Sequence, residues 1–159
     1  MNTNRISEQI GEVLRAKGLV MGTAESCTGG RIANMITLVA GSSDYFAGGV
    51  VSYSNEVKHH VQGVSEEALR AHGAVSREVV EQMALGAIRV LGCDCSVATS
   101  GIAGPGGGTP DKPVGTVWIA AALRDRVVSR CWHFGTVRAE NIEAAANAAL
   151  GMLAELLQE

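Results

Sequence analysis

The apolar residues of the chain follow two spacings that alternate along the sequence. Steps of three and four residues predict amphipathic helices at residues 6–17, 32–39, 77–91 and 142–157. Short apolar runs bounded by glycine or polar residues predict buried strands at residues 19–23, 45–53, 94–100, 114–123 and 127–134. Gly18 is expected to end the first helix. Ser54, Ser65 and Ser76, each followed closely by glutamate, are expected to begin three further helices.

The order of these elements indicates the fold class. Strands that alternate with helices imply a largely parallel sheet with helices on both faces. The residues 124–126 are few enough to join the last two strands as a hairpin, which adds an antiparallel strand. We therefore expect one α/β domain over residues 1–159, with three α/β/α layers around a mixed, mostly parallel sheet of about five strands. Gly48 and Gly49 predict a bulge or a close backbone approach in the second strand.

Composition and charge exclude several classes of protein. The 159 residues are 47% apolar, and a net charge of −3 leaves no basic excess for neutralising nucleic-acid phosphates. The N-terminal residues lack the apolar centre of a signal peptide, and the run at residues 117–123 is too short to span a bilayer. We expect a cytoplasmic protein that binds neither nucleic acid nor membrane. The four cysteines follow no zinc-site spacing, so reduced thiols and no metal are expected.

Three polar segments follow three of the predicted strands, at residues 25–30, 53–58 and 100–112. Because ligands of open α/β sheets bind beyond the carboxyl ends of the strands, we expect these segments to meet. The first contains Ser26 and leads into a helix. Backbone N–H groups around Cys27, Thr28 and Gly29 would then face a phosphate or an oxyanion. The alternative is that Ser26 or Thr28 only caps the helix.

The other two segments each allow two interpretations. Lys58 follows Tyr53, Ser54 and Asn55, and a lysine near a serine can act as its base where burial lowers the lysine pKa. A solvated surface lysine is the alternative. The glycines after residue 100 let the backbone approach a ligand closely, whereas a mobile surface loop is the competing interpretation.

Several familiar signatures are missing, which narrows the choice of chemistry. The glycine-rich segment fits neither the P-loop nor the dinucleotide-binding fingerprint. Ser26 lies in neither a G-x-S-x-G nor an S-x-x-K motif. Tyr53 and Lys58 are one residue too far apart for the Tyr-x-x-x-Lys of short-chain dehydrogenases, and the histidines form no H-E-x-x-H motif. Cys27 is a rival to Ser26 as the nucleophile.

Six motifs taken together resemble a known family. They are Ala24-Glu25-Ser26-Cys27-Thr28-Gly29-Gly30, Gly41-Ser42-Ser43, Tyr53-Ser54-Asn55-Glu56-x-Lys58, His72-Gly73-Ala74-Val75-Ser76, Ser100-Gly101-Ile102-Ala103-Gly104-Pro105 and Lys112-Pro113-Val114-Gly115-Thr116-Val117. In this order, over residues 6–150, the sequence resembles the CinA C-terminal domain family, whose stand-alone members are nicotinamide-nucleotide amidohydrolases. The resemblance implies a homo-oligomer that hydrolyses nicotinamide mononucleotide to nicotinic acid mononucleotide and ammonia without a cofactor.

The resemblance also implies roles for individual residues. Ser26 matches the nucleophile, Lys58 its base and Tyr53 the site tyrosine, which would assist the proton relay or help to protonate the departing ammonia. The substrate-binding residues that it implies are Thr28, Gly29, Gly30, Ser42, Asn55, Gly101, Ile102, Ala103, Gly104, Lys112 and Arg138. Family members often carry a second arginine about one turn after the first, and this sequence has no counterpart of it.

Two other functions remain open from the sequence. One is a module that senses a pyridine or adenine nucleotide without turning it over. The other is an interaction domain in which the glycine-rich loops serve assembly. Ammonia release from nicotinamide mononucleotide distinguishes the enzyme from both.

Overall fold

The computed structural model describes residues 5–159 and contains helices and strands in the predicted order. The helices are α1 (Arg5–Lys17), α2 (Arg31–Thr37), the 3-10 helix η1 (Ser42–Asp44), α3 (Asn55–Gln62), α4 (Glu66–His72), α5 (Arg77–Leu91) and α6 (Arg138–Gln158). The strands are β1 (Met21–Glu25), β2 (Phe46–Val51), β3 (Cys95–Gly101), β4 (Thr116–Leu123) and β5 (Arg126–His133). The largest difference from prediction is at α6, which begins at Arg138 rather than near Ile142.

The predicted helix boundaries at polar residues are confirmed. The hydroxyl oxygens of Ser54, Ser65 and Ser76 each accept a hydrogen bond from the backbone N–H three residues later, which satisfies an otherwise unpaired donor. After α1 the chain turns at Gly18, whose φ of 66° lies in the left-handed region that favours glycine. Local hydrogen bonding therefore defines these boundaries.

The five strands form one mixed sheet in the order β2-β1-β3-β4-β5. Strand β1 runs parallel to both β2 and β3, whereas β4 is antiparallel to β3 and to β5. The predicted hairpin is confirmed as β4 and β5. The parallel part of the sheet is thus limited to β2, β1 and β3, a smaller share than the sequence led us to expect.

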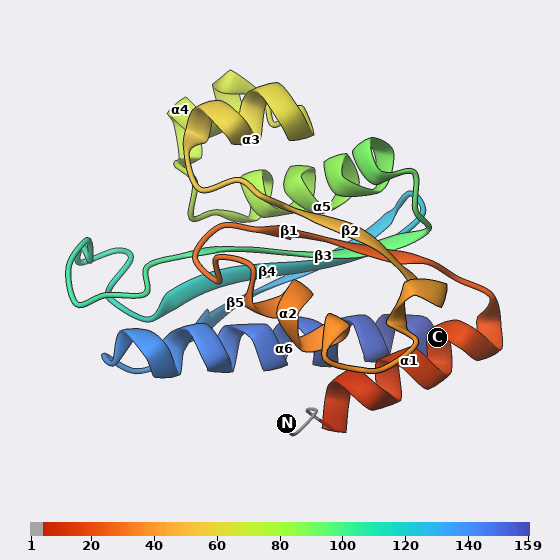
Figure 1. Ribbon diagram of the computed structural model, residues 1–159. Helices are drawn as coiled ribbons and strands as arrows, with labels where there is room; N and C mark the ends of the chain where they lie inside the picture. Colours follow the sequence, from red (N-terminus) through yellow and green to blue (C-terminus); the bar gives the residue numbers. More distant parts are fainter. Residues whose placement is uncertain (1–4) are drawn as a thin grey trace.

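Helices cover both faces of this sheet, as the three-layer prediction requires (Figure 1). Helices α1, α2 and α6 pack on one face, where the sheet contributes larger side chains such as Met21, Val97 and Ile119. Helix α5 packs on the other face against small side chains, which are Ala24, Ala98, Ala120 and Ala122. Helices α3 and α4 lie beyond α5 (Figure 1). Within residues 5–159, no helix combines the length and apolar character that crossing a membrane requires.

The glycine pair of β2 produces the predicted irregularity. The register between β1 and β2 shifts directly before the glycine pair: Met21 pairs with Phe46, but the next residue, Gly22, pairs with Gly48. A Cβ at Gly49 would lie 2.3 Å from Thr23 Oγ1, so a larger residue there would collide with β1. Glycine therefore lets the edge strand β2 lie against β1, and this pairing brings the segment after β2 to the end of β1.

Candidate active site

The three predicted segments meet at the carboxyl ends of β1, β2 and β3. Backbone hydrogen bonds continue past the strand ends: Ser26 N–H donates to Thr99 O at 3.1 Å, and Ser52 N–H donates to Glu25 O at 2.8 Å. Because β1 is parallel to both neighbours, the chain leaves all three strands at the same edge. This edge borders a cavity of about 300 Å³.

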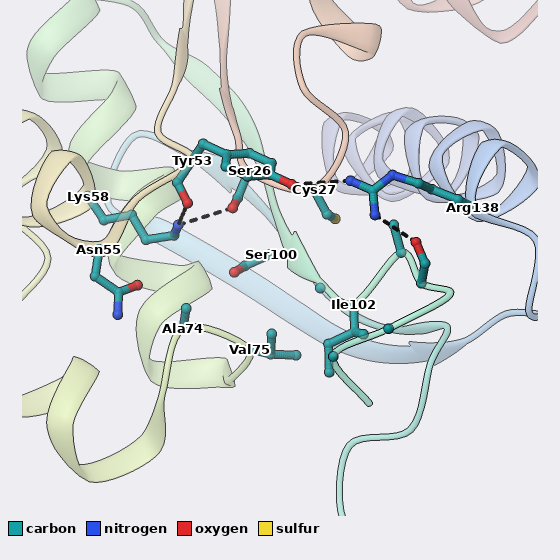
Figure 2. Close-up of a pocket in the computed structure, with 15 residues that line it drawn as sticks. Ser26, Cys27, Tyr53, Asn55, Lys58, Ala74, Val75, Ser100, Ile102 and Arg138 are labelled. Atoms are coloured by element: carbon teal, nitrogen blue, oxygen red, sulfur yellow. Dashed lines mark hydrogen bonds between the residues drawn. The ribbon is translucent and has the colours of Figure 1, made fainter. Parts of the chain in front are cut away.

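The cavity is lined by side chains from every segment that meets there, and by the loop before α5 and the start of α6 (Figure 2). Its lining residues are Ser26, Cys27, Tyr53, Asn55, Lys58, Ala74, Val75, Ser100, Gly101, Ile102, Ala103, Gly104, Gly106, Gly107 and Arg138. The lining contains two basic side chains and no carboxylate. The cavity therefore suits a small ligand that carries negative charge.

Ser26 and Lys58 are in direct contact at one end of the cavity. Lys58 Nζ lies 3.0 Å from Ser26 Oγ, and the two side chains are 1% and 8% exposed. Lys58 occupies the buried face of α3, one turn after its N-cap Ser54. Its amine also donates to Ser52 O at 2.7 Å and to Tyr53 O at 3.3 Å. The solvated surface lysine that the sequence left open is thus ruled out.

Burial determines the electrostatic character of this pair. Loss of hydration lowers the pKa of Lys58 below its ordinary value, because the charged amine is less well solvated there than in water. No carboxylate forms an ion pair with Lys58 within residues 5–159. A lysine with a lowered pKa can accept a proton from a neighbouring hydroxyl.

Arg138 lies at the other end of the cavity and holds two of its walls together (Figure 2). Its Nη1 donates to Gly104 O at 2.7 Å, and its Nη2 donates to the Tyr53 hydroxyl at 3.2 Å. Among the described residues, no carboxylate pairs with Arg138. Its charge is therefore available to an anionic group of a ligand.

Cys27 is a poor nucleophile despite its position beside Ser26. Burial raises the pKa of its thiol to about 11, so that the reactive thiolate is scarce at neutral pH. Lys58 Nζ, by contrast, approaches the hydroxyl of Ser26. Between the two candidates, the geometry favours Ser26.

Comparison with known proteins places this fold and cavity in a family. The family model described as the CinA C-terminal domain matches residues 3–157. The chain belongs to this family. Its similarity to solved members extends over the whole fold: a CinA superfamily protein from Klebsiella pneumoniae superimposes with a TM-score of 0.94 at 35% identity, over 99% of both chains. A competence/damage inducible protein from Agrobacterium tumefaciens gives 0.91 at 39% identity, over 100% of this chain and 99% of that one.

Some curated relatives of this CinA C-terminal domain match over most of their own length, and others are much longer than the matched region. Nicotinamide-nucleotide amidohydrolase PncC from Escherichia coli K12 is 55% identical over 118 residues, which are 74% of this chain and 72% of that protein. PncC from Enterobacter agglomerans is 50% identical over 89% of this chain and 88% of that protein. A CinA-like protein from Chloroherpeton thalassium is 49% identical over 96% of this chain, and the match spans only 37% of that longer protein.

Most residues that the family resemblance implied do line the cavity. Ser26, Tyr53, Asn55, Lys58 and Arg138 are all there. So is the glycine-rich loop, through Gly101, Ile102, Ala103 and Gly104. The contribution of Tyr53 to the proton relay or to protonation of ammonia stays a prediction. Its hydroxyl forms no hydrogen bond with the Lys58 amine among the described residues. It points to Arg138, and Tyr53 contacts Lys58 through its backbone carbonyl instead (Figure 2).

Three predicted binding residues lie in the turn after β1 but not in the cavity lining, which are Thr28, Gly29 and Gly30. Helix α2 begins only at Arg31, and the carboxylate of Glu25 already accepts the N–H groups of Ile32 and Ala33. The start of α2 is therefore not free to bind an anion. Of the predicted N–H donors, that of Gly29 donates to Ser26 O, whereas those of Cys27 and Thr28 donate to no backbone carbonyl among the described residues.

Ser42 and Lys112 are the other two predicted binding residues that the structure does not bring to the cavity. Ser42 begins η1, just before β2, and therefore lies at the amino edge of the parallel strands, opposite the cavity. Lys112 Nζ donates to His72 O at 2.7 Å and so ties the glycine-rich loop to the end of α4. Both corrections depend on tertiary position, which a motif in the sequence does not encode.

Sequence reasoning missed two kinds of residue. Ala74, Val75 and Ser100 line the cavity, and the only signal for them was their place inside or beside recognisable motifs. Asn141 is 2% exposed and fixes the glycine-rich loop from α6 by donating to Ala103 O at 2.9 Å. Its position in an apolar helix gave no signal of that contact. Within residues 5–159, no cluster of three or more His, Cys, Asp or Glu side chains could hold a metal ion.

Proposed function

We propose that this protein is a serine amidohydrolase that converts nicotinamide mononucleotide to nicotinic acid mononucleotide and ammonia. The observation that carries the proposal is the 3.0 Å contact between Lys58 Nζ and Ser26 Oγ at the wall of a cavity. Relatives that are 50% and 55% identical are named nicotinamide-nucleotide amidohydrolases, which supports this choice of substrate.

The surroundings of Lys58 suit a base that is held in one orientation. Two backbone carbonyl oxygens, those of Ser52 and Tyr53, accept hydrogen bonds from its amine. A neutral amine has two N–H bonds and one lone pair. With both N–H groups directed to carbonyls, the lone pair faces Ser26 and can take the proton of its hydroxyl.

The reaction then proceeds in two stages, which are formation of an ester at Ser26 and hydrolysis of that ester. Ser26 Oγ attacks the carboxamide carbon as its proton passes to Lys58, and the carbonyl oxygen becomes an oxyanion that the N–H groups of Cys27 and Thr28 stabilise. Collapse of this intermediate breaks the C–N bond, and the proton on Lys58 leaves with ammonia. Water, activated by the same amine, hydrolyses the resulting Ser26 ester to the carboxylate and restores the hydroxyl.

The two ends of the cavity suit the two ends of this substrate, a neutral carboxamide and an anionic phosphate. The carboxamide then binds at Ser26, and the phosphate binds at the guanidinium of Arg138, which pairs with no carboxylate among the described residues. A guanidinium forms strong, directional hydrogen bonds with phosphate oxygens. The pyridinium ring between these ends withdraws electrons from the carboxamide, which makes its carbon easier to attack by a hydroxyl with a modest base.

The direct test is to incubate the purified protein with nicotinamide mononucleotide and to measure ammonia and nicotinic acid mononucleotide. We expect the two products in equal amounts. Thermal stabilisation by nicotinamide mononucleotide with no ammonia at high protein concentration would instead support the nucleotide sensor. Absence of both effects would contradict either nucleotide-based function.

Replacing Arg138 by methionine tests where the phosphate binds. The expected result is an increase in KM for nicotinamide mononucleotide of about tenfold or more, since a hydrogen bond to a charged group contributes roughly 1.5–3 kcal/mol. The kcat/KM for nicotinamide riboside, which lacks the phosphate, should change little. A matched loss with both substrates would show that Arg138 acts only by holding Gly104 and Tyr53 in place.

A further inference from the structure

A chain of polar side chains lies behind the turn that carries Ser26. Glu25 and Thr99 are partners across the parallel strands β1 and β3, and both are fully buried. The hydroxyl oxygen of Thr28 lies 2.7 Å from Glu25 Oε1 and 2.8 Å from Thr99 Oγ1. Because a carboxylate only accepts hydrogen bonds, Thr28 donates to Glu25, and Thr99 in turn donates to Thr28.

The same carboxylate holds the start of α2. Glu25 Oε1 accepts the N–H of Ile32 at 2.9 Å, and Oε2 accepts the N–H of Ala33 at 3.0 Å. A negative charge at this end of a helix is favourable, and these bonds satisfy donors that have no partner inside the helix. Glu25 therefore ties the end of β1 to the start of α2, with Thr28 in the turn between them.

Backbone hydrogen bonds fix Ser26 within this turn. Its N–H donates to Thr99 O, and its carbonyl oxygen accepts the N–H of Gly29, both at 3.1 Å. Ser26 lines the cavity, whereas the side chain of Thr28 is directed back to Glu25 and Thr99. The one hydroxyl of Thr28 thus anchors the turn from the side opposite the cavity.

We propose that the side chain of Thr28 positions the nucleophile and does not itself contact the substrate. Through Glu25 and Thr99 it holds the turn so that the Ser26 hydroxyl and the N–H groups of Cys27 and Thr28 meet the same carbonyl group. This inference rests on the proposed amidohydrolase function. Displacing catalytic groups by about 1 Å can reduce a rate by roughly 100-fold.

The test compares two substitutions at this position. Thr28→Val keeps the shape of the side chain but removes its hydroxyl, whereas Thr28→Ser keeps the hydroxyl. We expect Thr28→Val to lower kcat by about 100-fold with KM for nicotinamide mononucleotide little changed, and Thr28→Ser to retain most of kcat. Thr23→Val is the matched control, because Thr23 is a fully buried threonine of β1 whose hydroxyl has no hydrogen-bond partner among residues 5–159. It should leave kcat unchanged.

Other results would overturn the inference. They are an unchanged kcat in Thr28→Val, an equal loss in Thr28→Ser, or a rise in KM that accounts for the loss. If Thr28→Val does not fold, Thr99→Val and Thr99→Ser provide the same comparison at the other hydroxyl. The pH dependence of kcat should keep its midpoint in all these variants, since none of the substituted hydroxyls contacts Lys58.

Covalent labelling of Ser26 tests the positioning role of Thr28 independently of whether nicotinamide mononucleotide is the substrate. A fluorophosphonate reacts with an activated serine whatever the natural substrate is, and mass spectrometry locates the adduct. If the unsubstituted protein does not hydrolyse nicotinamide mononucleotide, slower labelling of Ser26 in Thr28→Val than in Thr28→Ser still supports the positioning role. Equal labelling rates overturn it, and no labelling of the unsubstituted protein overturns both proposals.

Discussion

Replacement of Ser26 by alanine is expected to lower kcat for ammonia release from nicotinamide mononucleotide by roughly 10⁶-fold, the loss typical of removing a serine nucleophile. The substitution removes the oxygen that would attack the carboxamide carbon, and the remaining groups have no covalent route. The cavity and the Arg138 guanidinium stay intact. The variant should therefore still bind nicotinamide mononucleotide, which thermal stabilisation by the nucleotide would measure.

Cys27→Ala is the matched control for this prediction. Its side chain lies beside Ser26 in the cavity wall, but burial raises the pKa of the thiol to about 11. The backbone N–H at this position survives the substitution. Activity of the same order as that of the unsubstituted protein is expected. Full activity in Ser26→Ala together with loss in Cys27→Ala would mean that the thiol is the nucleophile and that the assignment of Ser26 is wrong.

Replacement of Lys58 by methionine is expected to lower kcat by about 10³-fold, within the range that one general base contributes. Methionine fills similar space but cannot accept the proton of Ser26. Lys17→Met is the matched control, since Lys17 is an exposed lysine at the end of α1 that is not part of the cavity lining. It should retain full kcat.

The pH dependence of kcat identifies the role of Lys58 independently of the size of the loss. The amine must be neutral to act as a base, so the rate of the unsubstituted protein should rise with pH and level off above the pKa of Lys58. Burial lowers that pKa, and the midpoint should therefore lie below about 10.4, the value of an ordinary lysine. The residual rate of Lys58→Met should lack this rise. A midpoint that persists in Lys58→Met would assign it to another group.

The two predictions have a common structural origin in the ends of parallel strands. Ser26 follows β1, and Lys58 lies on α3, which begins just after β2. Ser26 lies in neither the G-x-S-x-G nor the S-x-x-K motif, so these two motifs do not reveal the pair. The pairing of β1 with β2 brings them within 3.0 Å of each other.

Much of the fold could be predicted from the sequence because it depends on local patterns. Apolar spacing indicated the helices and strands, and serines followed by glutamate marked the starts of α3, α4 and α5. The short segment at residues 124–126 indicated the antiparallel hairpin. The extent of the parallel sheet was overestimated, because strand direction depends on how the chain crosses between strands and not on the residues within them.

The sequence by itself also determined which segments would form the site. Strands followed by polar and glycine-rich residues must deliver those residues to one edge of the sheet, if the strands are parallel. This reasoning located Ser26, Tyr53, Asn55, Lys58 and the loop at 101–104, and the family resemblance added Arg138. All of them line the cavity.

Only the tertiary structure decided where individual side chains point. Thr28 faces Glu25 and Thr99 rather than a ligand, the Tyr53 hydroxyl is held by Arg138, and Ser42 lies at the opposite sheet edge. The same holds for the burial of Lys58 on the inner face of α3, which lowers its pKa. The physical reason is that burial, hydrogen-bond partners and electrostatic environment come from residues distant in the chain. Local spacing carries no information about them.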